Sequence, residues 1–146
     1  MRALPRQLTV DELAELFEGR TRFVELLAGR EHPLEAARDV ARTLTDEEKK
    51  EVLDAHPAIG ERAGLSARSA REQGADADPA VLAELAELNR AYEARFGFRF
   101  VVFVDRRPKS EIVPILRERL ERTREEELAT ALDELVSIAE DRWRRG

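Results

Sequence analysis

The sequence of 146 residues contains no cysteine, one methionine and only two histidines. Without cysteine, a disulfide framework, a thiolate nucleophile and a cysteine-ligated zinc or iron–sulfur site are all excluded. No apolar run approaches the roughly 20 residues that a membrane-spanning helix needs, and residues 1–11 are too polar for a secretory signal. We therefore expect a cytoplasmic protein with no membrane partner.

An excess of positive charge is also missing. The 25 Lys and Arg are outnumbered by 31 Asp and Glu, which leaves a formal charge of -6. Because a nucleic acid would repel such a field, we expect no nucleic-acid partner, and a DNA-binding helical domain is a disfavoured alternative. The basic clusters at 106–109 and 144–145 lie at an element edge and a chain end, where solvated charge is the ordinary explanation.

The composition nevertheless supports a packed fold. Hydrophobic residues make up 42% of the chain, which is enough to build a core and argues against wholesale disorder. The length suits one domain with one core, covering residues 1–146. Helix signals dominate, so the predicted fold class is all-α: a single-domain bundle of about seven or eight helices.

Local start signals predict where several helices begin. Thr9 to Glu12 and Thr45 to Glu48 match the capping box, and Asp78-Pro79 places an N-cap residue before a proline at the first helical position. The predicted helices cover approximately residues 10–19, 22–29, 33–44, 46–55 and 79–97, with two more that carry the apolar residues of 112–120 and 128–139. In the helix of 112–120, Pro114 is tolerable only because we expect it to fall in the opening turn.

Residues 98–104 break the helical pattern. Phe98-Arg99-Phe100-Val101-Val102-Phe103-Val104 would be a strand on propensity, but no second run is available to pair with it. We therefore predict an irregular extended apolar strip packed among helices, with partial helix as the alternative. Such a backbone can serve the core, or it can direct amide groups into a pocket, because its amides are not already bonded within a helix.

The two histidines are the natural candidates for proton transfer near neutral pH. His32 precedes Pro33 and a helix, which is typical of an exposed linker. His56 precedes Pro57, which holds its backbone extended, and opens a stretch from Gly60 to Asp78 that is poor in core residues. That stretch indicates a site or a surface segment, so His56 is the better catalytic candidate.

Two further polar features have both a structural and a functional interpretation. In a helix, Ser69 would share a face with Glu72 or Gln73, and a short solvated helix is the simpler explanation. Arg142 continues the apolar stripe of the last helix, so its guanidinium should leave from the core-facing side. It would reach solvent, pair with a structural carboxylate, or bind a substrate carboxylate.

Several catalytic motifs are absent from the chain. There is no glycine-rich phosphate loop, no His-x-x-x-His metal pair and no Gly-x-Ser-x-Gly nucleophile motif. The many glutamates are better explained as helix surface, so we expect no metal site.

Four motifs, taken in order and spacing from about Leu13 to Trp143, resemble one enzyme family. They are Ala55-His56-Pro57-Ala58-Ile59-Gly60, Ser69-x-x-Glu72-Gln73, Leu88-Asn89-x-x-Tyr92-x-x-Arg95-Phe96-Gly97-Phe98-x-Phe100-Val101 and Ile138-Ala139-x-x-Arg142. The chain is similar to the 2-oxo-4-hydroxy-4-carboxy-5-ureidoimidazoline (OHCU) decarboxylases. Members are all-helical, usually homodimeric and cofactor-free, and they act in the last step from urate to (S)-allantoin.

The resemblance implies a set of site residues. His56, Glu72 and Arg142 match the catalytic positions. Pro57, Ser69, Gln73 and the backbone near Val102 would complete the substrate-binding pocket, and the partner would be OHCU itself.

The sequence departs from the family pattern at three places. Many members have Asp-Leu where this chain has Ala58-Ile59, and proline at the position of Arg99. The segment from His56 to Ser69 is also shorter by about one helical turn. Two alternatives follow: a catalytically inactive helical binding or scaffold module, and a decarboxylase of a related ureido or imidazoline acid, with Ala58 and Arg99 altering the substrate preference.

Overall fold

The computed structural model describes residues 3–59 and 78–146. These two ranges contain seven α-helices and no β-strand, which confirms the predicted all-α class. The helices are α1 Val10–Phe17, α2 Arg22–Ala28, α3 Pro33–Thr43, α4 Asp46–Asp54, α6 Pro79–Phe96, α7 Lys109–Arg119 and α8 Arg124–Arg145. Within the described ranges, none of these helices is both long and apolar enough to cross a membrane.

The predicted start signals act as caps in the structure. Thr9 and Thr45 each accept a hydrogen bond from the backbone amide of the glutamate three residues on, and the carboxylate of that glutamate accepts one from the amide of the cap residue. Asp78 accepts from the amide of Ala80, with Pro79 as the first residue of α6. Each cap satisfies backbone amides that have no partner inside the helix, so these starts are determined locally.

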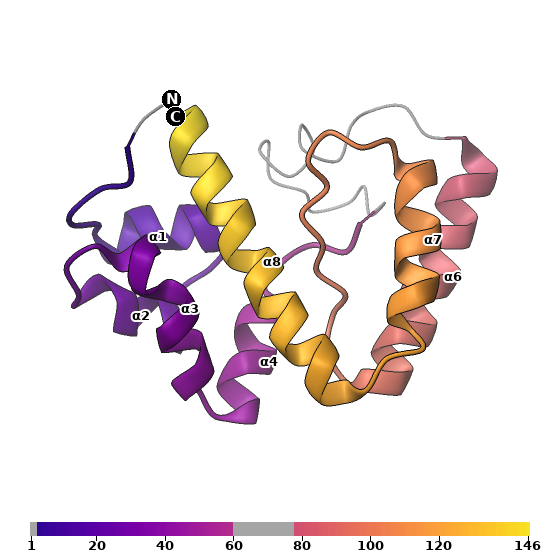
Figure 1. The fold of residues 1–146 in the computed structure, drawn as a ribbon, viewed down its shortest axis with the longest axis horizontal. Helices are drawn as coiled ribbons and strands as arrows, with labels where there is room; N and C mark the ends of the chain where they lie inside the picture. Colours follow the sequence, from indigo (N-terminus) through magenta and orange to yellow (C-terminus); the bar gives the residue numbers. More distant parts are fainter. Residues whose placement is uncertain (1–2, 60–77) are drawn as a thin grey trace.

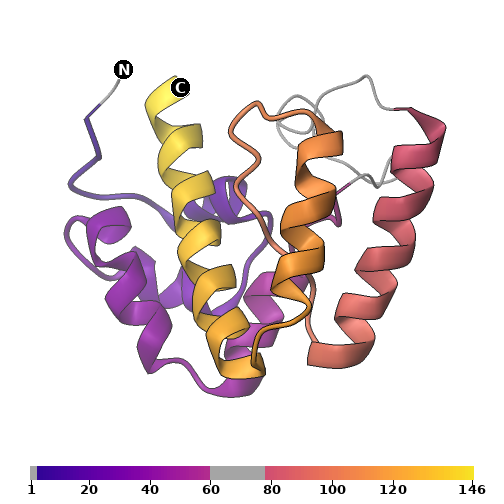
Figure 2. The ribbon, with the colours of Figure 1, turned by 45° about the vertical axis from the view of Figure 1, so that its right-hand side comes forward.

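The helices are arranged around α8, which runs through the middle of the molecule (Figure 1). Helices α1 and α3 contact one side of it, α2 packs between α1 and α3, and α4 contacts both α2 and α8. On the other side of α8, α6 and α7 lie side by side, and the strip of residues 98–104 passes between α7 and α8 (Figure 2).

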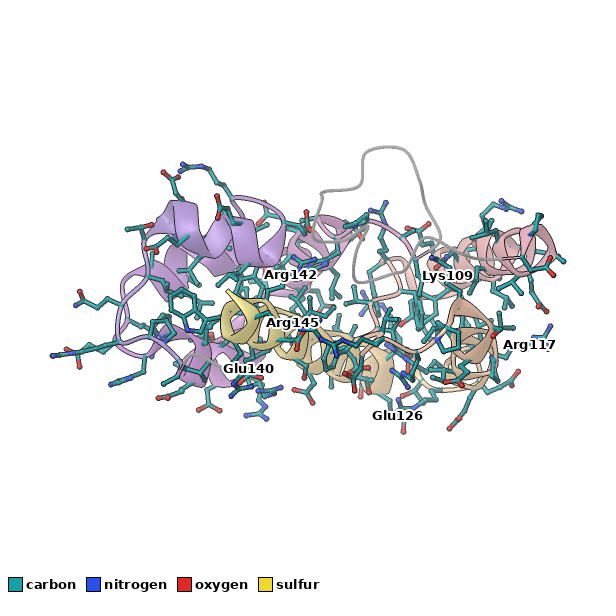
Figure 3. All side chains as sticks on the ribbon, turned by 90° about the horizontal axis from the view of Figure 1, so that it is seen from above. Lys109, Arg117, Glu126, Glu140, Arg142 and Arg145 are labelled. Atoms are coloured by element: carbon teal, nitrogen blue, oxygen red, sulfur yellow. The ribbon has the colours of Figure 1, made fainter. Side chains whose placement is uncertain are left out.

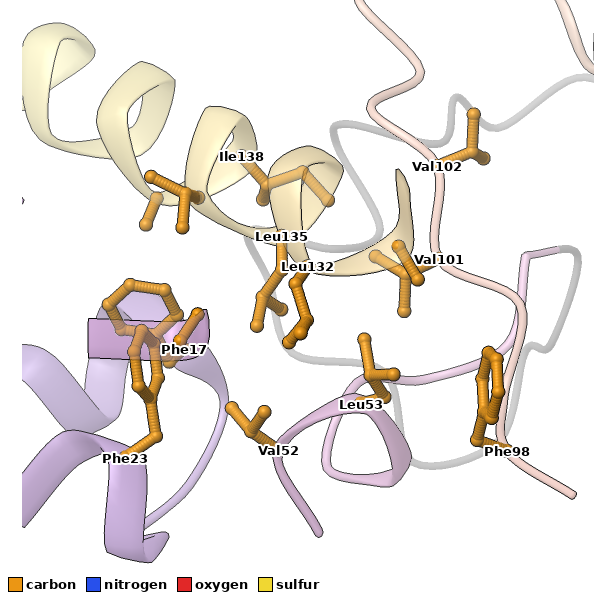
Figure 4. Packing of buried hydrophobic residues seen from close by; sticks show 14 of the residues in the cluster. Phe17, Phe23, Val52, Leu53, Phe98, Val101, Val102, Leu132, Leu135 and Ile138 are labelled. Carbon is orange, nitrogen blue, oxygen red and sulfur yellow. The ribbon is translucent and has the colours of Figure 1, made fainter. Parts of the chain in front are cut away.

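The buried apolar residues form one continuous cluster that includes both groups of helices. Phe17 and Phe23 meet edge to face, with ring centroids 5.2 Å apart, beneath the apolar face of α8. Figure 4 shows Leu132 and Leu135 of α8 facing Val52 and Leu53 of α4, with Val101 beyond them. The strip is therefore part of the core, because Phe98, Phe100, Val101, Val102 and Val104 are all buried.

The prediction for Pro114 was wrong. Helix α7 begins at Lys109, directly after Pro108, so Pro114 is its sixth residue and lies inside the helix. Proline there removes the hydrogen bond to the carbonyl of Ser110. Ser110 and Pro114 are both exposed, so water can solvate the freed carbonyl and the helix continues.

Residues 99–104 form neither helix nor strand, as an extended strip without a partner strand requires. Arginine guanidinium groups bind its free carbonyls in place of a neighbouring strand. Arg119 Nη1 donates to Val101 O (2.9 Å), while Arg107 donates through Nη2 to Phe103 O (2.5 Å) and through Nε to Val104 O (2.9 Å). Arginine side chains thus bind three carbonyls of the strip, which helps an extended segment to be buried among helices.

A buried polar network joins α6, α7 and α8 behind this strip. Glu127 is fully buried and accepts hydrogen bonds from Tyr92 Oη (2.6 Å), Arg119 Nε (2.7 Å) and Arg122 Nη1 (3.1 Å). Burial raises the pKa of Tyr92, and its hydrogen bond to Glu127 raises it further, so the phenol acts as a donor. The Arg119 guanidinium also lies 4.5 Å from the centroid of the Phe100 ring. Through Arg119, these contacts fix the position of the strip relative to α8.

Candidate active site

His56 lies just beyond the C-terminal end of α4. Ala55 caps that helix, and the His56 amide donates to Leu53 O (3.2 Å), which turns the chain before Pro57. The His56 side chain is buried, with the residue 5% exposed, while Pro57 and Ala58 are half-buried. His32, in contrast, is exposed at the start of α3, as predicted for a linker histidine.

The imidazole of His56 is held neutral. Burial, followed by the positive charges of Arg142 and Arg99, lowers its pKa from 6.5 to about 3, against the opposing effect of the Glu18 carboxylate. Its Nε2 atom is buried and has no hydrogen-bond partner among the described residues. A buried histidine ring nitrogen without a partner is unusual and is typical of a group that meets a ligand.

Arg142 lies inside the molecule rather than reaching solvent. Its side chain is 3% exposed, and Figure 3 shows it on the side of α8 that faces α1, whereas Arg117 and Glu126 project outward. Its Nη1 donates to Leu16 O (2.9 Å) and its Nη2 lies 3.0 Å from Glu18 Oε1. Of the alternatives for Arg142, solvent exposure is therefore wrong and a carboxylate partner is present.

Glu18 is a residue that sequence reasoning missed. It caps the C-terminal end of α1 in the left-handed conformation, with φ 65° and ψ 22°, although Gly19 follows directly. A non-glycine residue in that region is disfavoured, and a carboxylate at a helix C-terminus also faces the negative end of the helix dipole. The sequence does show an acidic residue next to a glycine at the C-terminal end of a predicted helix, where acidic residues are disfavoured. It does not show that this residue pairs with Arg142.

Val102 is buried in the strip, with the residue 7% exposed. The carbonyl of Val101 and the amide of Val102 belong to one planar peptide unit and point in opposite directions. Because Arg119 binds the Val101 carbonyl, it also determines the direction of the Val102 N–H. The backbone at this predicted site position is thus held rigidly by a residue of α7.

At two of the three departures from the family pattern, the residues of this chain have structural roles. Ile59 is buried, and its carbonyl accepts a hydrogen bond from Asn89 Nδ2 (3.0 Å) of α6, which ties the segment after His56 to that helix. Arg99 donates from Nη1 to the carbonyls of His56 (2.5 Å) and Asp54 (3.2 Å). Its guanidinium therefore contacts the backbone that carries His56.

The structure brings together only part of the predicted site. His56 and Arg142 are both buried and near enough for the arginine charge to lower the pKa of the histidine. Ser69, Glu72 and Gln73 lie outside the described residues. Among residues 3–59 and 78–146, no group of three histidine, aspartate or glutamate side chains is arranged to hold a metal ion.

Comparisons with known proteins agree on one family. The family model described as OHCU decarboxylase matches residues 2–144. The 2-oxo-4-hydroxy-4-carboxy-5-ureidoimidazoline decarboxylase of Xenopus laevis is 36% identical over 118 residues, which cover 77% of this chain and 58% of that protein. The protein of the same name from Haloferax volcanii is 35% identical over 98 residues, covering 64% of this chain and 58% of that protein.

The fold is likewise shared with a solved structure. A crystal structure of OHCU decarboxylase in the presence of (S)-allantoin matches with a TM-score of 0.74 and 26% identity, covering 90% of this chain and 94% of that chain. The present chain spans 58% of the length of both the Xenopus and the Haloferax proteins. Because the family model covers almost all of its residues, the chain belongs to the OHCU decarboxylase family.

Proposed function

We propose that this protein decarboxylates OHCU to (S)-allantoin without a cofactor, as a carboxy-lyase of urate degradation. The observation that carries the proposal is the buried, neutral His56, with Nε2 unpartnered among the described residues, in the electric field of the buried Arg142. Membership of the OHCU decarboxylase family supports the choice of substrate. The crystal structure that matches this fold was obtained in the presence of (S)-allantoin, the proposed product.

The reaction requires the protein mainly to position the substrate and to transfer protons. The bond between the ring and the carboxylate breaks, CO2 leaves, and the electron pair moves into the ring towards its C=N group. The substrate therefore supplies its own electron sink, and no Schiff-base lysine or thiamine is needed. The hydroxyl proton must move to the ring carbon, and the face of that transfer sets the (S) configuration. The ring nitrogen that received the electron pair takes up one further proton, which comes from solvent.

His56 is suited to begin as a base. With a pKa of about 3, its imidazole is neutral at physiological pH and has a lone pair that can accept the hydroxyl proton. A bound carboxylate would favour the protonated ring, so an imidazolium formed in this way can return the proton to the ring carbon. We assign both transfers to His56 because it is the only histidine that is buried in the described residues.

Arg142 is assigned the binding of the anionic substrate. Its contacts with Leu16 O and Glu18 fix the plane of the guanidinium, and an orientated guanidinium can bind a carboxylate through two parallel hydrogen bonds. Glu72 is proposed to accept hydrogen bonds from substrate N–H groups. Pro57, Ser69, Gln73 and the Val102 amide are proposed to line the rest of the pocket, with the amide stabilising charge on a ring oxygen.

We also propose that residues 1–146 form a single domain that acts as a homodimer in the cytoplasm. The continuous buried cluster supports the single domain, and the absence of cysteine suits a reducing compartment. Family resemblance supports the dimer. Size-exclusion chromatography with light scattering would give the mass, for which twice 16.6 kDa is expected.

The function is tested by reconstitution. Urate is treated with uricase and hydroxyisourate hydrolase, the protein is added, and circular dichroism follows the allantoin formed. The expected result is rapid formation of the (S) enantiomer. Racemic allantoin at the uncatalysed rate would remove the decarboxylase assignment.

Variants separate the enzyme from a scaffold that has kept the fold. His56→Asn and His56→Ala should each abolish turnover while far-ultraviolet circular dichroism stays that of the parent protein. His32→Asn is the matched control, because His32 is exposed, and it should retain full activity. Equal activity of both His56 variants and the parent would show that His56 does not take part in proton transfer.

A further inference from the structure

Arg99 leaves the extended strip and reaches the end of α4. Its Nη1 donates to the carbonyl of His56 at 2.5 Å and to the carbonyl of Asp54 at 3.2 Å. Its own backbone N–H donates to Asp54 Oδ1 at 3.0 Å, and its Nε lies 3.4 Å from Glu93 Oε1 of α6. The side chain is 28% exposed, so it is held among these partners rather than extended into solvent.

Arg99 makes these contacts at the C-terminal end of α4, where backbone carbonyls lack partners within the helix. The last carbonyls of a helix have no partner inside it, and Asp54 is the final residue of α4. His56 is two residues further on, is followed by Pro57, and its amide makes a single backbone hydrogen bond, to Leu53 O. Arg99 is thus the side chain that holds the His56 carbonyl, and the direction of a carbonyl is linked to the orientation of its own Cα and side chain.

We propose that Arg99 is a positioning residue for the reaction, one that fixes the His56 imidazole by binding the His56 carbonyl and tying the end of α4 to the strip. This inference rests on the proposed function of His56. It assigns to Arg99 a role through His56 and not through the substrate, so Arg99 does not alter substrate choice by direct contact.

The charge of Arg99 acts on His56 in addition to its hydrogen bond. The guanidinium helps to lower the pKa of His56, after burial and Arg142, whereas Glu18 of α1 raises it. Arg142 of α8, Glu18 of α1 and Arg99 of the strip are the charged groups that act on His56. Removing Arg99 therefore changes both where the imidazole lies and how readily it accepts a proton.

The test compares Arg99→Met, which removes the charge and all donors, with Arg99→Lys, which keeps the charge and one donor group. Arg95→Met is the matched control, because Arg95 is an exposed arginine of α6 that donates to Arg122 O. For each protein, kcat, KM and the enantiomeric excess of allantoin are measured. A misplaced catalytic group typically costs on the order of 10-fold to 100-fold in rate, so Arg99→Met should lose about that much kcat, with KM within about twofold.

A spectroscopic signal makes the test independent of turnover. The chain has only two histidines, so carbon–hydrogen NMR signals of the His56 and His32 rings are readily assigned. Arg99→Met should shift or broaden the His56 signal and leave that of His32 in place, Arg99→Lys should restore part of both kcat and the signal, and Arg95→Met should change neither.

The possible outcomes distinguish the two proposals. Unchanged kcat together with an unchanged His56 signal in Arg99→Met overturns the positioning role. A raised KM with unchanged kcat overturns it too, because Arg99 would then contact the substrate. If the parent protein itself forms no (S)-allantoin, the proposed function fails, while the NMR comparison still decides whether Arg99 positions His56. If Arg99→Met does not fold, Arg99→Lys alone must show reduced kcat and a displaced His56 signal, or the role is rejected.

Discussion

The Glu18 carboxylate and the Arg142 guanidinium form an ion pair of 3.0 Å that joins the end of α1 to the last turns of α8. Both side chains are largely buried, at 14% and 3% exposed, so the pair is poorly screened by solvent. Removing one partner of a buried pair leaves an uncompensated charge, which is costly. Glu18 thus stabilises the fold and orientates the proposed substrate-binding arginine.

Glu18→Gln should accordingly affect both stability and activity. We expect it to lower the free energy of unfolding by about 3 kcal/mol, towards the lower end of what breaking a buried ion pair costs, and to raise KM at least severalfold as Arg142 loses its orientation. Urea unfolding and steady-state kinetics measure the two effects. Glu15→Gln, an exposed change in the same helix, should alter neither. Unchanged KM in a folded Glu18→Gln protein would contradict the role given to the pair.

Acidification should destabilise the protein through His56. The unfolded histidine binds a proton near pH 6.5 and the folded one only near pH 3, so between these values the unfolded state holds more protons. The stability that comes from the neutral buried ring is complete above pH 6.5 and is lost as the pH falls through this window. The expected slope is about 1.4 kcal/mol per pH unit.

The contribution of His56 is isolated by comparison. Urea unfolding at several pH values between 7 and 4 should show that slope in the parent and in His32→Asn, and a slope smaller by about one proton in His56→Asn. Identical slopes in the parent and His56→Asn would mean that the His56 pKa is not lowered.

Replacing Pro114 should stabilise the protein. Pro114→Ala restores the hydrogen bond to Ser110 O in the second turn of α7 and relieves the clash of the ring with that turn. Proline is about 3 kcal/mol less favourable than alanine inside a helix, offset by up to about 1 kcal/mol because alanine leaves the unfolded chain freer. We expect a gain of about 2 kcal/mol, seen as a higher melting temperature. A loss of stability would show that the ring itself packs usefully.

The network around Glu127 should be a major stabilising feature. Glu127→Gln leaves Arg119 without its buried carboxylate partner and should lower the free energy of unfolding by about 3 to 5 kcal/mol. Glu125→Gln, in the exposed first turn of the same helix, is the control and should change stability by less than about 0.5 kcal/mol. A small effect of Glu127→Gln would mean that the hydrogen bonds of Tyr92 and Arg122 to this position are enough to stabilise the network.

Local features of the chain determined much of the fold. Thr9, Thr45 and Asp78 cap their helices as the sequence predicts, because a cap depends on residues within three or four positions. The apolar spacing of α8 likewise predicts that Arg142 leaves from the buried face. His56 could be chosen over His32 as the candidate because it precedes the core-poor stretch, which is visible in the chain.

Only the tertiary structure decided how these parts meet. The sequence predicts that the strip of residues 98–104 lacks a partner strand, but it does not show that arginines bind the strip's carbonyls or that Arg99 reaches back to His56. Nor does it show that Glu18 adopts a left-handed conformation and pairs with Arg142, or that α7 begins early enough to enclose Pro114. The physical reason is one of range: helix starts and faces depend on neighbours within one or two turns, whereas ion pairs and carbonyl contacts depend on distances that packing alone sets.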